Sequence, residues 1–275
     1  MTHAIESISP EHLSALKAGL QRTWAAGDYS RIGTTLQIVG ERLAESMDLS
    51  AGMRVLDVAA GNGNASLAAA RRWCEVTATD IVPALLGQLS ARAAAEGLDI
   101  ACREADAERL PFADGAMDAT LSTFGAMFAP DQPRALAELI RVTRPGGQIG
   151  LANWTPDGFV GRFFALLAQY NPPPPGLPMP TRWGVEAFID RQFASVCADV
   201  RIVRRDFVFR YRSPRHWLAV FSQCCGMTQR TLAGLTPELR HSLQQDILRL
   251  IRDCNRASDG TMVVASDYLE VVVRR

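Results

Sequence analysis

A strand that ends in a glycine-rich turn is the feature that most constrains how this 275-residue chain can fold. The run VLDV at residues 55–58 predicts a buried strand, AAGNG at 59–63 predicts a tight turn, and residues 65–73 predict a helix. Glycines in such a turn let a ligand approach the main chain closely, and the N-terminus of the following helix attracts an anionic group. The segment therefore indicates a binding site for a nucleotide or a nucleoside.

Apolar strands alternate with helices from residue 54 to residue 153. Strands are expected at 54–59, 75–80, 100–105, 116–122 and 148–153, and helices at 65–73, 83–96 and 132–143. The sequence RPGG at 144–147 predicts a helix stop and a turn. Alternation of this kind predicts a doubly wound α/β fold with a mostly parallel sheet covered on both faces. The carboxyl ends of the strands, and the loops after them, then lie along one edge.

The segments on either side of this core have a different pattern. Residues 1–50 are mostly helical, and the prolines of 171–180 predict a stiff loop. Further helices are expected at 185–192, 214–226 and 237–255, and further strands at 200–211 and 262–273. We expect these two strands to join the same sheet as an antiparallel pair with helices inserted between them. Three parts result, namely N-terminal helices (1–50), a Rossmann-like core (51–154), and a helical cap with the last two strands (155–275).

Composition excludes several classes of partner. The formal net charge is zero, so we expect no nucleic-acid partner. No apolar run approaches the roughly 20 residues of a membrane-inserted helix, so we expect no insertion into a membrane.

Residues 1–13 lack the basic start and apolar core of a signal peptide, which predicts a cytoplasmic location. The six cysteines match no zinc-binding pattern, so no metal is expected and buried thiols are favoured over disulfides. The adjacent Cys224 and Cys225 are the pair of most interest.

Three successive strands end in, or are followed directly by, an acid. Asp57 closes the first strand, Asp80 the second, and Asp106 follows the third. In a doubly wound sheet these ends meet at the crevice where the chain reverses direction. Asp80 could accept hydrogen bonds from ribose hydroxyls, Asp106 from an adenine amino group, and Asp57 from a ligand ammonium, directly or through water. The set fits an adenosine that carries an amino acid better than one that carries phosphates.

Other interpretations of the same residues stay open at this point. Gly61-x-Gly63-x-x-Ser66 is close to the GxGxxG pattern of dinucleotide-binding folds, and an acid after the second strand also suits the ribose of NAD. Asp106 could cap a helix, and Asp57 could hold backbone amides of its own loop.

The chain resembles class I S-adenosylmethionine-dependent methyltransferases, of the branch that includes the ubiquinone and menaquinone C-methyltransferases. The matching pieces are VLDVAAGNG (55–63), TATD (77–80), ADAERLPF (105–112), MDATLSTFGAMF (117–128) and RVTRPGG (141–147). The resemblance implies a Rossmann-like sheet of seven strands, mostly parallel with the last strand antiparallel, and a cap inserted among its helices. It also implies S-adenosyl-L-methionine above the strand ends, covered by N-terminal helices.

The resemblance assigns a set of residues to the cofactor. Alanine stands at position 59 where the family usually has glycine, which is a mild departure. Tyr29 is expected over the methionine end, with simple helix packing as the alternative. Phe124 is expected beside the sulfonium, with packing in the protein core as the alternative. The whole cofactor set is Tyr29, Asp57, Ala59, Gly61, Asn62, Gly63, Asp80, Ile81, Asp106, Ala107, Ser122, Thr123 and Phe124.

The expected activity is in-line methyl transfer to a small-molecule acceptor, at carbon or oxygen, with the acceptor itself unidentified. No general base is evident, and His216, near Arg210, Arg212 and Arg215, is the one histidine considered for that role. The alternatives are an NAD(P)-binding Rossmann oxidoreductase and a non-catalytic protein that binds S-adenosylmethionine. A homodimer is compatible with the sequence, which does not determine the oligomeric state.

Overall fold

The computed structural model describes residues 10–194 and 199–275, so residues 1–9, with His3, and Cys197 lie outside the described residues. Seven strands form one sheet in the order β3-β2-β1-β4-β5-β7-β6. Their bounds are β1 Arg54–Val58, β2 Glu75–Asp80, β3 Ile100–Glu104, β4 Met117–Thr123, β5 Thr143–Trp154, β6 Asp199–Tyr211 and β7 Met262–Arg274. Because β7 runs antiparallel to both of its neighbours, six strands share one direction, which confirms the predicted fold class.

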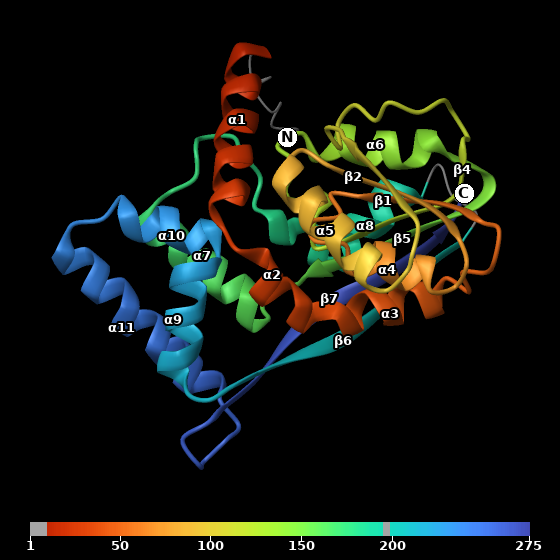
Figure 1. Ribbon diagram of the computed structural model, residues 1–275. Helices are drawn as coiled ribbons and strands as arrows, with labels where there is room; N and C mark the ends of the chain where they lie inside the picture. The colour runs from red at the N-terminus through yellow and green to blue at the C-terminus, as the bar shows by residue number, and fades with distance from the viewer. Residues whose placement is uncertain (1–9, 195–198) are drawn as a thin grey trace.

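Helices surround the sheet and form a second lobe beside it (Figure 1). The long helices are α1 Pro10–Ala26, α3 Gln37–Ser46, α5 Pro83–Ala95, α6 Gln132–Val142, α7 Phe159–Tyr170, α9 Pro214–Cys224 and α11 Pro237–Cys254. The shorter ones are α2 Tyr29–Ile32, α4 Asn64–Ala70, α8 Glu186–Phe193, α10 Gly226–Ala233 and the 3₁₀ turns η1 Gly33–Leu36, η2 Ala126–Phe128 and η3 Pro180–Gly184. None of these described helices combines the length and the apolarity that crossing a bilayer requires.

The side-chain alternation of the central strands explains the layered core. On β1, Val55 packs with α3 and α4, whereas Leu56 and Val58 pack on the opposite face with α6. All three side chains are fully buried. A strand that is apolar on both faces is stable only between two helical layers, so the parallel core forms as the alternation predicts.

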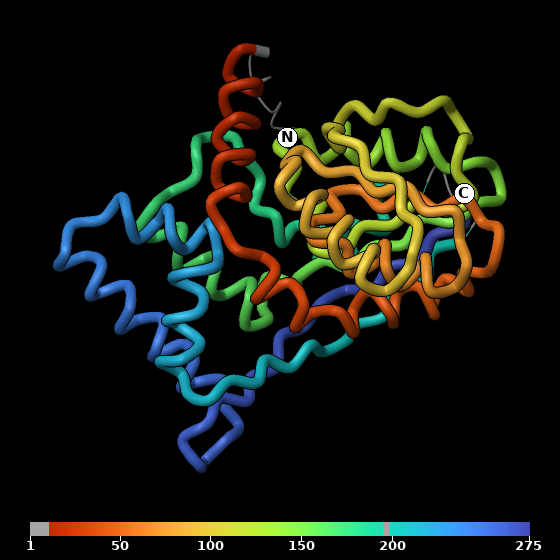
Figure 2. The backbone as a smooth tube through the Cα atoms, viewed as in Figure 1, coloured from red at the N-terminus to blue at the C-terminus, as the bar shows by residue number. Residues whose placement is uncertain are grey.

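Two insertions build the cap lobe. The chain leaves the core after β5 as α7, returns through η3 and α8 to β6, leaves again as α9, α10 and α11, and returns as β7 (Figure 2). Edge-to-face and stacked aromatic contacts join the cap helices, with Trp217 stacked on Phe221 at 3.9 Å and Phe163 edge-on to Trp217 at 5.3 Å.

Three features of the fold differ from the sequence-based expectations. Helices α7 and α10 were not predicted, and β5 begins at Thr143 rather than at residue 148. The RPGG segment continues β5 because Gly146, at φ +75°, donates its N–H to the Arg275 carbonyl at 2.7 Å. Helix α10 is separate from α9 because Cys225 adopts an extended conformation between them.

A buried carboxylate joins the last two strands to helix α3. Glu270 on β7 is 1% exposed and forms an ion pair with Arg205 on β6 at 2.8 Å. Its Oε1 also accepts a hydrogen bond from the Ser46 hydroxyl at 2.6 Å. The Arg205 side chain is one-third exposed, whereas the Glu270 side chain is almost fully buried.

Because the two side chains differ in exposure, replacing one or the other should lower the free energy of unfolding by different amounts. Arg205→Met should lower the free energy of unfolding by about 3 kcal/mol, because it leaves a buried carboxylate without its cation. Glu270→Gln should cost about 1 kcal/mol, because the amide oxygen can still accept from Ser46 and the Arg205 side chain is partly exposed. Urea denaturation of both variants measures the difference, and equal losses would contradict this account of the pair.

Candidate active site

A cavity of about 740 Å³ lies over the carboxyl ends of β1, β2, β3 and β4, closed above by α1 and on one side by the cap. The walls of the cavity fall into a part lined by carboxylates and a part lined mainly by aromatic side chains. The ends of β2 and β3 contribute carboxylates, whereas β5, β6 and the cap helices contribute mainly aromatic side chains. The predicted cofactor residues that line it are Tyr29, Ala59, Gly61, Asn62, Asp80, Ile81, Asp106, Ala107, Thr123 and Phe124.

The glycine loop after β1 forms the floor of the cavity. Gly61 and Gly63 have φ values of +57° and +90°, which glycine adopts without strain. Gly63 does not line the cavity; a Cβ there would contact Leu89 of α5, so glycine is required for packing. Asn62 donates its side-chain amide to the Tyr29 carbonyl at 2.8 Å, and Asn64 donates to the Gly33 carbonyl at 2.7 Å. The two asparagines therefore hold the segment from α2 to η1 over the loop.

Ala59 occupies the position where the family usually has glycine, and its backbone is left-handed. Its φ is +54°, a region that costs an L-residue free energy. Ala59 also lies against Gly125, where an added Cβ would stand 2.7 Å from the Ala59 Cβ. The chain thus keeps the backbone geometry of a glycine at position 59 and accommodates the methyl group by having glycine at position 125.

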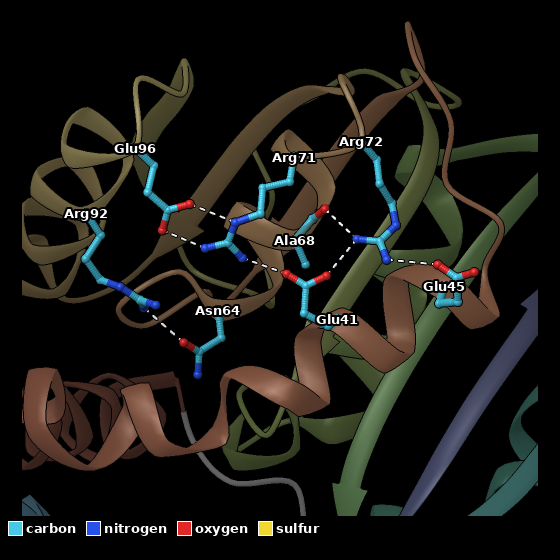
Figure 3. A network of polar contacts seen from close by, with 8 residues as sticks. All are labelled: Glu41, Glu45, Asn64, Ala68, Arg71, Arg72, Arg92 and Glu96. Atoms are coloured by element: carbon cyan, nitrogen blue, oxygen red, sulfur yellow. Dashed lines mark hydrogen bonds and ion pairs between the residues drawn. The ribbon is translucent and has the colours of Figure 1, made fainter.

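A charged network holds the glycine loop from behind (Figure 3). Arg92 on α5 donates to the Asn62 carbonyl at 2.6 Å and to the Asn64 Oδ1 at 2.9 Å. Beside it, Arg71 pairs with Glu41 of α3 and with Glu96, each at 2.6 Å. Arg92 therefore holds the point where the loop enters α4, and the Arg71 ion pairs join the other end of α4 to α3 and to the end of α5.

Asp80 lies in the cavity wall with both carboxylate oxygens already engaged by the backbone. Oδ2 accepts from the Gly61 N–H at 2.9 Å and Oδ1 from the Val82 N–H at 2.9 Å. Burial raises the pKa of Asp80, and these N–H groups oppose that rise. Each oxygen keeps a second lone pair, so Asp80 can also accept hydroxyl groups of a ligand.

Asp106 and its neighbour Glu108 meet a cation from helix α1. The Lys17 ammonium lies 2.6 Å from the Asp106 Oδ2 and also pairs with Glu108, whose side chain is 3% exposed. Asp106 Oδ1 accepts the Glu108 N–H at 2.9 Å, as in a local turn. On the same face of α1, Gln21 donates to the Ile81 carbonyl at 2.6 Å.

Asp57 does not line the cavity and so cannot contact a ligand in it directly. It is 1% exposed beneath the glycine loop, and its Oδ2 accepts the Ser66 hydroxyl at 2.5 Å. Its Oδ1 has no hydrogen-bond partner among the described residues. Burial raises the pKa of Asp57 to about 7, although the Ser66 hydrogen bonds lower it. The structure therefore favours a structural role for Asp57, which holds the first turn of α4 directly after the loop.

Ser122 and His216 also lie away from the cavity. Ser122 is 1% exposed, donates to the Val58 carbonyl at 2.7 Å and accepts from the Ala126 N–H at 2.9 Å, so it fixes the end of β4. His216 lies at a separate surface hollow with Arg210, Arg212 and Thr261. Its placement on the outer side of α9 removes the geometric basis for a role as general base in the cavity.

Phe124 and Tyr29 lie where the two kinds of wall meet. Phe124 has a φ of +56° and stacks on Trp154 with ring centroids 3.9 Å apart and planes within 4°. Strained backbone of this kind is concentrated at functional sites. The Tyr29 hydroxyl accepts the Gly226 N–H at 3.2 Å, and burial raises its pKa well above its usual range. Tyr29 thus joins the glycine loop to the cap, because its carbonyl accepts from Asn62 and its hydroxyl accepts from Gly226.

The apolar half of the cavity contains no histidine or carboxylate among the described lining residues. Cys225 contributes a thiol there, Cys224 is buried beside it, and both cysteines are free. The aromatic and apolar residues of this half are Phe128, Trp154, Val160, Phe163, Phe164, Phe209, Phe221 and Met227.

Several lining residues were not singled out from the sequence. Lys17 and Gln21 lie on the α1 stripe that also carries Leu20 and Trp24. The sequence signal that could have identified them is the presence of polar side chains within the apolar stripe of that helix. Glu104 at the end of β3 was also missed, since an acid on an exposed edge strand carries no pattern of its own.

Comparisons with known proteins agree with this geometry. The profile of a family described as "Methyltransferase domain" matches residues 55–147, from β1 into β5. The uncharacterised protein Rv1403c of Mycobacterium tuberculosis is 41% identical over 248 residues, which are 88% of this chain and 89% of that protein. Demethylmenaquinone methyltransferase of Thermus thermophilus is 40% identical over 120 residues, 42% of this chain and 54% of that enzyme.

Among solved structures, the YcgJ protein of Bacillus subtilis superposes with a TM-score of 0.60. The likeness covers 88% of this chain and 99% of that one, at 17% sequence identity. At this identity the likeness concerns the fold, and it extends beyond the core into the insertions.

The left-handed backbone at Ala59 predicts that glycine would stabilise the protein. Ala59→Gly should raise the free energy of unfolding by about 0.5–1 kcal/mol, because the relief of strain exceeds the added entropy of the unfolded chain. The matched control is Ala60→Gly in the same loop, where φ is not positive, and it should lose about 0.5–1 kcal/mol. Thermal and urea unfolding measure the stability of both variants. An equal loss of stability at positions 59 and 60 would contradict the claim that the backbone at Ala59 is strained.

The buried Asp57 predicts a specific pH dependence. Because burial raises its pKa to about 7, the folded chain keeps a proton that the unfolded chain releases near pH 4. This group therefore lowers stability as the pH rises from about 4 to about 7. Relative to wild type, Asp57→Asn should gain about 1 kcal/mol or more across that window, since asparagine does not titrate. Urea denaturation at several pH values tests this, and a pH-independent difference would contradict it.

Proposed function

Because the chain belongs to the class I S-adenosylmethionine-dependent methyltransferases, we propose that it transfers a methyl group to a small, largely apolar acceptor bound in the cavity. The observation that carries this proposal is the division of the cavity into a carboxylate-lined half and an aromatic half. The first half suits the cofactor and the second suits the acceptor.

The residues at the strand ends fit S-adenosylmethionine. Its ribose hydroxyls and adenine amino group are donors, and Asp80 and Asp106 offer carboxylate acceptors at the ends of β2 and β3. Its sulfonium and ammonium are cationic, which suits a wall rich in carboxylates. In this assignment the amino-acid portion lies over Gly61 and Asn62, and Asp57 acts by holding the first turn of α4 after that loop.

The cap residues suit a molecule with a sizeable apolar surface. Aromatic and aliphatic side chains from β5, α7, β6 and α9 form the walls, with few polar groups, and such walls bind ligands chiefly by excluding water. The Tyr29 hydroxyl and the Cys225 thiol are the polar side-chain groups available there to orient the acceptor.

Alignment and desolvation are the chain's contributions to the reaction. Bound S-adenosylmethionine supplies an activated methyl group, so the acceptor needs placement in line with the carbon–sulfur bond more than further activation. Phe124, fixed by stacking on Trp154, separates the two halves and sets the approach of the acceptor. Since no histidine or carboxylate lines the described aromatic half, we propose an acceptor carbon or oxygen that is already nucleophilic on binding.

The site is poorly suited to NAD(P). A dinucleotide places its pyrophosphate at the glycine loop and the N-terminus of the next helix. Here the Gly61 N–H of that loop is already donated to the Asp80 carboxylate at 2.9 Å. One backbone amide of the loop is therefore not available to hold a pyrophosphate.

A paired binding experiment tests the cofactor. Calorimetry should show binding of S-adenosylmethionine but not of NAD. Asp80→Asn should weaken S-adenosylmethionine binding about tenfold or more, because a charged acceptor of the ribose hydroxyls is lost. Asp114→Asn removes the same charge at a side chain that is 81% exposed and outside the cavity, and should leave the affinity unchanged. Equal affinities for Asp80→Asn and wild type would overturn the assignment.

A transfer assay tests the reaction. Methyl-labelled S-adenosylmethionine should label apolar phenols or quinols in a panel that also contains amines and small acids. Binding of the cofactor without labelling of any acceptor would favour the non-catalytic alternative. Labelling confined to small, charged acids would contradict the apolar acceptor.

A further inference from the structure

Lys17 connects helix α1 to the wall of the cavity at the proposed adenine end. Its ammonium meets Asp106 at 2.6 Å and also pairs with Glu108, both in the loop after β3. Glu108 in turn accepts the Asp131 N–H at 2.7 Å, at the start of α6. A single side chain on α1 is therefore linked to two segments of the core.

The ion pair is partly shielded from water. Lys17 and Asp106 are 27% and 32% exposed, whereas Glu108 is 3% exposed. Burial raises the pKa of Glu108, and the ammonium of Lys17 opposes that rise. Exposed ion pairs contribute little, but a carboxylate as buried as Glu108 is costly without a cation. Loss of the Lys17 contact therefore carries a cost that a surface pair would not.

Helix α1 is attached on its other side to the cap. Arg230 of α10 donates to the Gly19 carbonyl and to the Thr23 hydroxyl, both at 2.8 Å. Toward the loops after β2 and β3, Lys17 and Gln21 make polar contacts from α1. Figure 1 shows α1 standing between the two lobes. Separation of α1 from these loops would therefore open the cavity at the adenine end while α1 stayed attached to the cap.

We propose that Lys17 is a positioning residue that closes α1 over the adenine end of the bound cofactor by holding Asp106 and Glu108. The inference rests on the proposed placement of the cofactor. Both Asp106 oxygens are engaged, by Lys17 and by the Glu108 N–H, but each keeps a second lone pair that can accept the adenine amino group. The ligand contacts both α1 and the core, so its binding strengthens the closure, and the closure by linkage strengthens binding.

The sequence offers a site-specific probe, because Lys17 is its only lysine. Acylation by an amine-reactive ester, followed by mass spectrometry of the peptide that contains Lys17, reports the exposure of this one ammonium. Saturating S-adenosylhomocysteine should slow acylation of Lys17 about tenfold or more. An unchanged or faster rate in the presence of bound ligand would overturn the proposal.

A bound ligand could slow acylation simply by covering Lys17. Variants of Lys17 distinguish this shielding from a closing function, because only closure affects how fast the ligand leaves. Lys17→Met should speed dissociation of S-adenosylhomocysteine about tenfold, and Lys17→Arg should keep it within about threefold of wild type, since the cation is retained. The matched control is Arg22→Met, which removes the same charge from an exposed position of α1 outside the cavity. Stopped-flow displacement measures all four proteins.

The outcomes are distinguishable from failure of the proposed function. If wild type binds S-adenosylhomocysteine but Lys17→Met releases it no faster than Arg22→Met, the closing function of Lys17 is wrong and the cofactor assignment stands. If wild type does not bind it at all, the cofactor assignment fails and this inference fails with it. The labelling experiment on wild type decides the question even where Lys17→Met does not fold.

Discussion

Parallel pairing of β1 with β2 and β4 is the constraint on which the site depends. The register places Asp57 beside Ala78 and Leu121, and the loops that follow all leave from the same edge. A hydrogen bond of 2.9 Å from the Gly61 N–H to Asp80 then joins the end of β1 to the end of β2. Once this bond forms, the glycine loop, the acid and the floor of the cavity have one arrangement. The N-terminal helices and the cap build their contacts on it.

The site combines rigid and strained elements. Behind the loop, Arg92 of α5 donates to the Asn62 carbonyl and to the Asn64 side chain (Figure 3). Ion pairs of Arg71 with Glu41 and Glu96 hold the other end of α4. In front of it, Ala59 and Phe124 keep left-handed backbone conformations that only a well-packed surrounding can maintain. Such residues face the point where cofactor and acceptor would meet. Preorganised placement of this kind is what the proposed in-line transfer would require, since the described aromatic lining of the cavity presents no histidine or carboxylate.

The sequence was sufficient to predict the core but only part of the site. Strand ends such as Asp80 and the turn at Gly61 were predictable because local pattern and parallel topology determine them. Asp57 was assigned toward a ligand because its type and spacing do not reveal that Ser66 holds it below the loop. His216 and Lys17 depend on which face of a helix meets the cavity, and contacts distant in sequence decide that. Lys17 and Asp106, for example, are 89 residues apart.

The cap is attached to the sheet in a way that bears on how such proteins diversify. Both insertions, α7 to α8 and α9 to α11, leave and re-enter through β5, β6 and β7, while the carboxylate-lined half is built from β1 to β3 and their loops. In the proposed function, the residues that face the acceptor could therefore change or lengthen with little disturbance to those that face the cofactor. Related chains could then acquire new acceptors through the insertions alone while keeping the same methyl donor.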